Sequence, residues 1–273
     1  MKKLKIIRRI IFIVAILCLI IIGSYTYFIS PSDYGFENYN FVHKNIPSEL
    51  NGFKIAYISD INLNDKNDLE RLQKAIEELN EQPFDMIIFG GDLYDSKVFS
   101  TKEVSSALKS ISCKYGKFAV LGDKDESASM EVTEVLNNGG FEVIDNEART
   151  LYYKDASFTM IGCQKDTDIS DFKINTKTIT LLVTHQPDSF TQYQGKIDLQ
   201  LSGHSYGGSL YIPFYGPLFP MEDAKTYNHS IYEESGSTLL VSNGFSGPSS
   251  LPYKLFARNQ INFITLKTSS TSE

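Results

Sequence analysis

Cysteine is scarce in this sequence of 273 residues. The three cysteines are Cys18, Cys113 and Cys163. Cys18 lies between two leucines in an apolar run, and we interpret it as an apolar filler. The other two cysteines specify no disulfide framework, so a small fold stapled by disulfides is not expected. Whether Cys113 and Cys163 pair with each other stays open at this point.

Positive charge is also scarce outside the first 30 residues. The whole chain has 26 Lys and Arg against 33 Asp and Glu, which gives a formal charge of −7. Because residues 1–30 contain five basic side chains and no acidic one, the rest of the chain carries −12. A domain this acidic repels nucleic acids and anionic lipid surfaces. We therefore expect no DNA or RNA among its partners.

The sequence does contain a long uncharged run, at residues 10–29. A helix of 20 residues is about 30 Å long, enough to cross the hydrocarbon core of a bilayer. Basic residues precede the run and indicate that the N-terminus faces the cytoplasm. These basic residues are Lys2, Lys3, Lys5, Arg8 and Arg9.

A cleaved signal peptide is the alternative interpretation of this run. Such a peptide ends in small residues at its cleavage site. Here the run ends in Tyr25, Tyr27 and Phe28 instead, which suit the aromatic belt at a membrane interface. We therefore predict an uncleaved, single-pass anchor in the cell membrane within residues 1–30, with the rest of the chain outside the cytoplasm.

The residues after the anchor are numerous enough for one domain with its own core. We predict a stalk and lead-in strand at 31–50, the main domain at 51–267 and a polar tail at 268–273. In the first half of the main domain, strand patterns alternate with helical ones. Strands are predicted at 53–59, 85–90 and 117–121, and helices at 69–80, 102–111 and 130–138. This βαβαβα order predicts a parallel sheet flanked by helices.

The second half of the domain is dominated by strand patterns with few helices between them. They lie at 141–144, 150–154, 158–163, 178–184, 198–201, 209–211, 238–243 and 262–267. Together the two halves predict an α/β fold in which two sheets pack face to face and helices cover the outside.

Metal-binding side chains follow several of these strands. Asp60, Asp92 and Asp123 come after strands of the first half, and His185 and His204 come after strands of the second. Ligands gather at the carboxyl ends of strands in such sheets. A single strand-end Asp is often a helix N-cap, but three together repel one another and favour a cation. The set therefore predicts a metal site.

The segments around these residues resemble, in order and spacing, the motifs of the calcineurin-like metallophosphoesterases, and in particular their membrane-anchored bacterial branch. The resemblance runs from about residue 53 to residue 266. It implies a four-layer αββα sandwich and a two-metal site that hydrolyses phosphate mono- or diesters. The matching segments are Ser-Asp60-Ile-Asn62, Gly-Gly-Asp92, Leu-Gly-Asp123-Lys124-Asp125, Thr-His185-Gln-Pro and Gly-His204-Ser-Tyr206.

The resemblance implies that metal site two is retained. Asp92 matches the carboxylate that bridges both metals, and Asp123, His185 and His204 match the other ligands of site two. Asp123 stands where the family usually has Asn, a change that adds negative charge and should not weaken cation binding. Four such side chains are enough for one four-coordinate divalent ion, with Mn, Fe and Zn as candidates.

Metal site one is depleted by the same comparison. Asp60 matches its first ligand, but Asn62 and Tyr206 stand where the family has His. An Asn side chain offers only a neutral oxygen, and a phenol ligates only when ionised, with a reference pKa of about 10. We therefore expect one strongly bound ion rather than two, and weaker activation of the attacking water than a metal pair provides.

Lys124 and Asp125 match the two remaining catalytic positions. Lys124 replaces the His that contacts substrate in the family, and Asp125 matches the acid that supports that His. We hypothesise that the Lys124 ammonium lies among Asp60, Asp92 and Asp123 and supplies the charge of the missing metal. The alternative is an ordinary solvated lysine in a loop.

A five-residue pattern at 203–207 suggests a different chemistry. It fits the Gly-x-Ser-x-Gly nucleophile elbow of serine hydrolases, with Ser205 as the nucleophile. That elbow requires a helix directly after the Ser, whereas residues 208–213 have a strand pattern that ends in Pro213. Ser205 is therefore better explained as a loop residue beside His204.

Two functions stay open from the sequence. The first is a membrane-anchored, metal-dependent hydrolase of phosphate esters, and a lipid-like ester would suit the apolar run at 211–219. The second is a catalytically inactive relative that binds a ligand or a protein partner at the membrane surface.

Overall fold

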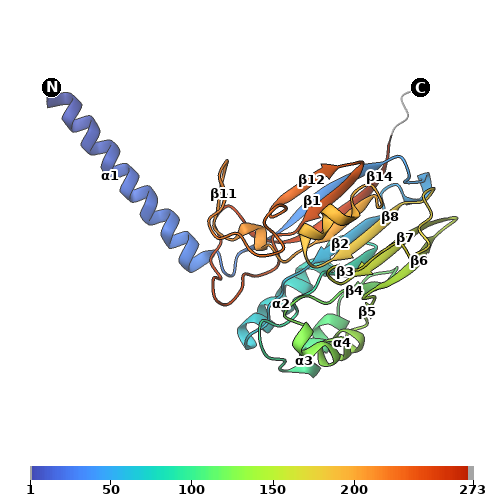
Figure 1. The fold of residues 1–273 in the computed structure, drawn as a ribbon. Helices are drawn as coiled ribbons and strands as arrows, with labels where there is room; N and C mark the ends of the chain where they lie inside the picture. Colours follow the sequence, from blue (N-terminus) through green and yellow to red (C-terminus); the bar gives the residue numbers. More distant parts are fainter. Residues whose placement is uncertain (1, 270–273) are drawn as a thin grey trace.

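The protein is described by a computed structural model that covers residues 2–269. It begins with the long helix α1 (Lys2–Ser24), which a turn of π-helix (Tyr25–Ile29) extends. The apolar part of the segment Lys3–Ile29 is unburied, and the segment is long and apolar enough to cross a membrane. Figure 1 shows α1 leaving one end of the folded domain.

The first sheet has six strands in the order β1-β14-β2-β3-β4-β5. Strands β2 to β5 are parallel, whereas β14 pairs with β2 antiparallel and with β1 in parallel. Helices α2, α3 and α4 connect the parallel strands, which confirms the predicted βαβαβα order. The bounds are β1 (Tyr34–His43), β2 (Lys54–Ile58), α2 (Lys66–Asn80), β3 (Met86–Phe89), α3 (Thr101–Lys109), β4 (Lys117–Ala119), α4 (Ser129–Asn138), β5 (Glu142–Val143) and β14 (Asn259–Thr268).

The second sheet also has six strands, in the order β12-β13-β9-β8-β7-β6. Its central strands β13, β9, β8 and β7 are parallel, and antiparallel strands close both edges. The bounds are β6 (Glu147–Tyr153), β7 (Ala156–Cys163), β8 (Thr180–Thr184), α5 (Phe190–Tyr193), β9 (Leu199–Ser202), β12 (Ser230–Glu234) and β13 (Ser237–Val241).

Apolar side chains fill three interfaces between these layers. Ile88 and Leu181 belong to the interface between the two sheets, and Leu72 of α2 packs on the outer face of the first sheet. Phe190 of α5 packs on the outer face of the second sheet. The predicted two-sheet sandwich is therefore confirmed. Its fourth layer is thin, because within residues 2–269 the α-helical cover of the second sheet is the four-residue α5.

The structure differs from the sequence-based prediction at three places. Residues 209–211 are not a sheet strand: a 3-10 turn (Tyr206–Gly208) leads into the short hairpin β10 (Tyr211–Ile212) and β11 (Gly216–Pro217), which stands apart from both sheets. Strand β12 was not predicted, because it is a mostly exposed edge strand with two glutamates. In segment 31–50, predicted as a stalk and lead-in strand, strand β1 already begins at Tyr34 and pairs along its whole length with β14.

Two further predictions concern the C-terminal tail and the cysteines. Strand β14 runs to Thr268, so the predicted tail at 268–273 begins inside this strand, and residues 270–273 lie outside the described residues. Cys113 and Cys163, both within the described part of the chain, are free thiols. Cys163 is buried in β7.

Candidate functional site

The five candidate metal ligands converge at the carboxyl ends of strands from both sheets. Asp60, Asp92 and Asp123 follow β2, β3 and β4, and His185 and His204 follow β8 and β9. The two sheets pack face to face with these ends together, so the two halves of the chain contribute to one cluster. This is the placement that the sequence predicts.

The loops that carry the cluster have an unusual backbone. Asp60, Asn62, Asp92, His204 and Tyr206 all have positive φ angles, between 52° and 65°. Such angles are uncommon for residues with a side chain, and they concentrate at functional sites where the surrounding structure holds them. Here they turn each side chain back toward the space between the strand ends.

A glycine makes the close approach of these loops possible. Gly91 has a φ of 97°, and a Cβ atom at this position would lie 2.6 Å from the backbone nitrogen of Gly122 and 2.7 Å from Nδ1 of His185. No larger residue fits without moving the backbone. The Gly-Gly-Asp92 motif therefore lets three loops meet at one point.

His185 is the centre of the cluster. Its Nδ1 donates a hydrogen bond of 2.7 Å to the carbonyl of Gly90, which leaves Nε2 as the ring nitrogen that faces the cluster. Nε2 lies 3.4 Å from Asp92 Oδ2 and 3.8 Å from Asp60 Oδ1. It is buried and has no hydrogen-bond partner among the residues that the structure describes. A buried nitrogen of this kind, facing two carboxylates, fits a metal ligand.

His204 and Asp123 form the second half of the cluster. His204 Nδ1 lies 3.1 Å from Asp123 Oδ2, and its Nε2 donates a hydrogen bond of 2.8 Å to the carbonyl of Glu222. The ligand atoms of Asp123, His185 and His204 lie within 4.8 Å of one another, as do those of Asp60, Asp92 and His185. Two groups with metal-ligand chemistry therefore share His185.

The electrostatics of the cluster favour positive charge. Burial would lower the pKa of His185, but the Asp92 and Asp60 carboxylates outweigh it and raise this pKa well above its usual range. Burial raises the pKa of Asp60, and the nearby Asp92 adds to the rise. Burial opposes ionisation of Asp92 too, but His185 and Lys124 bring its pKa down to about 2. The cluster thus draws protons or other cations to itself.

Tyr206 lies beside Asp92 and Asn62 in the cluster. Its hydroxyl lies 3.4 Å from Asp92 Oδ2 and 3.5 Å from Asn62 Oδ1. Burial and the charges of Asp60 and Asp92 raise the pKa of this phenol well above its usual value. Tyr206 is therefore a neutral hydrogen-bond donor to Asp92.

Lys124 does not lie among the three aspartates as hypothesised. Its ammonium forms an ion pair with Asp95 and donates a hydrogen bond of 2.7 Å to Asn62 Oδ1. Asp95 was not considered from the sequence, and it draws the ammonium to the rim of the cluster. The contact of Lys124 with Asp92 is made by the backbone instead, through a hydrogen bond of 3.0 Å from its N–H to Oδ1.

Asp125 supports the loop of Asp92. Its carboxylate accepts hydrogen bonds of 2.8–3.0 Å from the backbone N–H groups of Asp92, Leu93 and Gly122. Burial and the charge of Asp92 raise the pKa of Asp125 to about 7, against the effect of these donors. Asp125 therefore fixes the backbone of two strand-end loops rather than the side chain of Lys124.

Lys254 is a second lysine at this site that sequence reasoning missed. It is buried, and its ammonium donates hydrogen bonds of 2.7 and 2.9 Å to the carbonyls of Tyr206 and Asn243. Its Nζ lies 5.3 Å from the centre of the Tyr206 ring, and that of Lys124 lies 5.5 Å from the same ring. Nothing in the pattern around residue 254 distinguishes it from a surface lysine, so only the fold reveals it.

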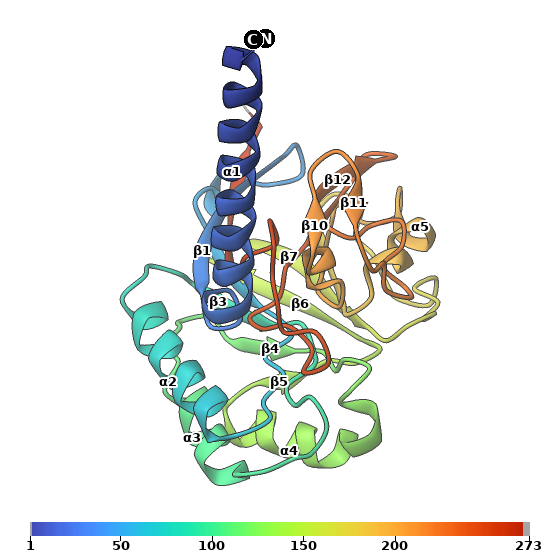
Figure 2. The same cartoon turned by 90° about the vertical axis from the view of Figure 1, so that its left-hand side faces the viewer.

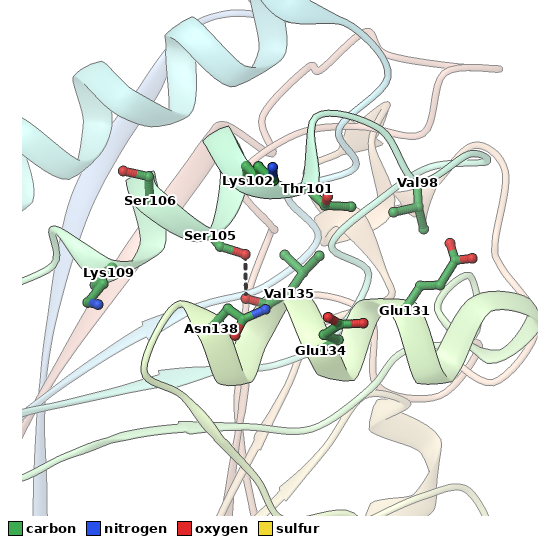
Figure 3. Close-up of a pocket in the computed structure, with 10 residues that line it drawn as sticks. All are labelled: Val98, Thr101, Lys102, Ser105, Ser106, Lys109, Glu131, Glu134, Val135 and Asn138. Atoms are coloured by element: carbon green, nitrogen blue, oxygen red, sulfur yellow. Dashed lines mark hydrogen bonds between the residues drawn. The ribbon is translucent and has the colours of Figure 1, made fainter.

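Cavities lie beside the cluster and away from it. One of about 250 Å³ borders Asp123, Gln186 and Lys165, and the Gln186 amide also donates to Asp123. A larger one, of about 750 Å³, lies between α3 and α4, where Figure 3 shows Ser105 hydrogen-bonded to the carbonyl of Val135. Its described lining contains none of the candidate metal ligands, so the chemistry is expected at the smaller cavity.

Comparisons with known proteins agree with this site. The model of the calcineurin-like phosphoesterase family matches residues 53–207. The chain is 30% identical over 239 residues to the metallophosphoesterase YkuE of Bacillus subtilis, covering 82% of each chain. It is 28% identical over 188 residues to the phosphodiesterase YaeI of Escherichia coli, covering 63% of this chain and 68% of that one.

A third relative is a transmembrane protein with a metallophosphoesterase domain from Danio rerio. It is 26% identical over 254 residues, which cover 81% of this chain and 55% of that one. The family match extends over more than half of the chain, so this protein belongs to the calcineurin-like metallophosphoesterases. Members of this family are phosphoesterases that depend on divalent metal ions.

Proposed function

We propose that this protein is a membrane-anchored phosphoesterase that holds one divalent ion at metal site two and hydrolyses phosphate mono- or diesters. The ligands would be Asp92, Asp123, His185 and His204. One observation carries this proposal: His185 Nε2 is buried and unpartnered within the described chain, and it faces carboxylates while Gly90 fixes the other ring nitrogen. In such an arrangement the hydrogen bond from one ring nitrogen to a backbone carbonyl orients the other nitrogen toward a metal ion.

The neighbouring residues prepare the site for phosphate ester hydrolysis. A divalent ion, with Mn, Fe and Zn as candidates, would supply Lewis acidity and lower the pKa of water. The Glu222 carbonyl orients His204, and Asp125 holds the loop of Asp92. Lys124, at the substrate-contacting position of the family, would place an ammonium at the rim of the site, where it can attract a substrate phosphate.

The contacts of Tyr206 support one ion rather than two. Its neutral hydroxyl and Asn62 replace two imidazoles, so site one would keep only the carboxylates of Asp60 and Asp92. The ammonium groups of Lys124 and Lys254 flank the same ring and supply positive charge without a metal. These groups would make the protein depend on site two alone.

The anchor determines where this chemistry would take place. We propose that residues 1–30 hold the chain in the cell membrane with the N-terminus in the cytoplasm and the domain at 51–267 outside it. A phosphate ester close to the membrane, including a lipid-like one, would then be the substrate. Two measurements would support this arrangement: the protein extracted from membranes has its full-length mass, and protease added to intact cells digests it. Loss of residues 1–30 would contradict it.

The competing proposal is an inactive relative that binds a ligand or partner at the membrane surface. The replacement of imidazoles by Tyr206 and Asn62 favours it. The two are separated by assaying the full-length chain in detergent for hydrolysis of bis(p-nitrophenyl) phosphate with added manganese. Turnover that EDTA abolishes and manganese restores supports the enzyme. Absence of turnover with manganese bound would contradict it and favour the binding role.

A further inference from the structure

The β10–β11 hairpin exposes an uncharged aromatic tip. Residues 209–221 contain no charged side chain. Phe214 at the tip is fully exposed, and Tyr215 and Phe219 are 77% and 61% exposed. The hairpin belongs to neither sheet, so these rings do not contribute to the cores of the domain. Large aromatic side chains gathered on one protruding element are typical of a surface that meets another apolar phase.

The base of this hairpin is connected to the end of the anchor helix. Leu210 and Leu255 form a parallel bridge, so the segment 253–256 runs along the start of the hairpin. In that segment Tyr253 stacks on Tyr27 at 5.2 Å between ring centres, and the N–H of Lys254 donates to Ser30 Oγ at 2.8 Å. One continuous set of contacts therefore joins the anchor, this segment and the hairpin.

The hairpin and the anchor lie at the same end of the domain. Figures 1 and 2 both show β11 on the α1 side of the domain, and in Figure 1 the hairpin rises beside the base of α1, which leaves the domain obliquely. If α1 spans a bilayer, the hairpin approaches the surface of that bilayer from outside. The exposed Tyr27 and Phe28, in the π-helical turn that extends α1, would mark the level of the aromatic belt on the anchor.

The charge pattern favours lipid over a charged partner. The rest of the domain is acidic, and it would be repelled by anionic lipid headgroups. A tip without charge, rich in aromatic rings, suits the interface of a bilayer whatever its headgroup charge. The docking it provides would therefore rest on apolar burial and would not need anionic lipid.

The hairpin is joined to the candidate metal site at both of its ends. Strand β10 starts seven residues after His204, and β11 ends five residues before Glu222, whose carbonyl accepts the hydrogen bond from His204 Nε2. Its position thus bears directly on the orientation of one candidate ligand. A fixed hairpin would hold that imidazole in place.

We propose that the β10–β11 hairpin inserts its aromatic tip into the interfacial layer of the bilayer that α1 spans, as a second membrane contact that holds the site at the lipid surface. This inference rests on the proposed membrane anchoring. It assigns to the hairpin a lipid partner, and it brings phosphate esters at the bilayer surface within reach of the site.

The absence of tryptophan from the chain allows a direct test. Phe214→Trp introduces a sole reporter at the tip, and Tyr152→Trp is the control, because Tyr152 is also a largely exposed aromatic residue but lies on β6 away from the hairpin. Both full-length variants are placed in nanodiscs of neutral phosphatidylcholine, with and without brominated acyl chains. Brominated lipid should quench the emission of the tryptophan at 214 strongly and leave that at 152 unchanged.

Phe219→Trp provides a second, independent reporter and should also be quenched. Equal, unquenched emission at 214, 219 and 152 in chains that stay in the nanodiscs would overturn hairpin docking alone. Chains that leave the nanodiscs would overturn the proposed anchor and the proposed docking together. Metal-dependent turnover is measured separately, so that a failure of the proposed activity is distinguished from a failure of docking. Emission at 214 that changes only with protein concentration would indicate a second copy of the chain and would also overturn lipid docking.

Discussion

The phenol oxygen of Tyr206 lies 3.4 Å from Oδ2 of Asp92, so a neutral hydroxyl contacts one carboxylate of the candidate metal cluster. The same Oδ2 atom also lies 3.4 Å from Nε2 of His185. One carboxylate oxygen therefore contacts both a candidate metal ligand and a neutral phenol. This asymmetry leads to the predictions below.

Asp92 is expected to be required for both metal binding and turnover. Asp92→Asn should remove the bound ion and lower kcat/KM for a soluble phosphodiester by more than about 100-fold. Even residues that only hydrogen-bond to a metal ligand typically contribute about 10- to 100-fold to metal affinity or activity. Asp155→Asn, at an exposed turn, is the matched control and should keep both properties. Wild-type turnover in Asp92→Asn would show that the chemistry takes place elsewhere.

Restoring the imidazoles should create a second metal site. The double variant Asn62→His, Tyr206→His would place two ring nitrogens beside Asp60 and Asp92, the carboxylates already present there. Metal analysis should then give two manganese ions per chain instead of one, together with faster turnover, because paired ions activate the attacking water. An unchanged single ion would mean that the loops cannot form site one.

Asp125 is expected to act through the backbone it holds. Asp125→Asn replaces one acceptor oxygen by an amide group and leaves buried N–H groups of the Asp92 loop without a partner, which costs about 1–3 kcal/mol. The melting temperature should fall even in metal-free protein. Asp95→Asn, which removes the negative charge that pairs with the Lys124 ammonium, is the comparison and should alter turnover more than stability. Reversal of these two effects would contradict the assignment.

Lys254 should make stability depend on pH. Burial lowers the pKa of its ammonium to about 7, below the unfolded value of about 10.4. Between these values the unfolded chain binds more protons than the folded chain, so the contribution of this group rises with pH, by at most about 1.4 kcal/mol per unit. It is fully present above about pH 10 and is lost as the pH falls through about 7.

Substitution isolates this effect from other titrating groups. The melting temperature of wild type relative to Lys254→Met should increase between about pH 7 and about pH 10. The exposed Lys154→Met serves as the control and should follow the wild type at every pH. A constant difference between wild type and Lys254→Met would show that Lys254 keeps an ordinary pKa.

Much of this fold and site could be predicted from the sequence because local patterns determine them. The strand and helix periods of residues 53–138 predicted β2 to α4, and strand-end carboxylates predicted the cluster. The alternation in β12 is hidden by exposed glutamates, so that edge strand was missed. The hairpin at 211–217 has an apolar strand pattern, but its two short strands pair with each other and with neither large sheet.

The side-chain partners within the site required the fold. Lys124 was expected among the aspartates, but its ammonium pairs with Asp95. No sequence motif predicts that contact. Lys254 is 130 residues further along the chain, and its burial follows from the packing of segment 253–256 against the anchor end and the hairpin. Sequence motifs therefore predict candidate metal ligands better than they predict the cationic side chains that would take the place of a metal ion.

The number of metal ions per chain tests the central claim most directly. The full-length protein is purified in mild detergent, equilibrated with excess manganese, freed of unbound metal, and analysed for manganese and protein. We predict one ion per chain in the wild type and none in Asp92→Asn. Two ions per chain would contradict the depletion of site one, and no bound ion would contradict the retained site two.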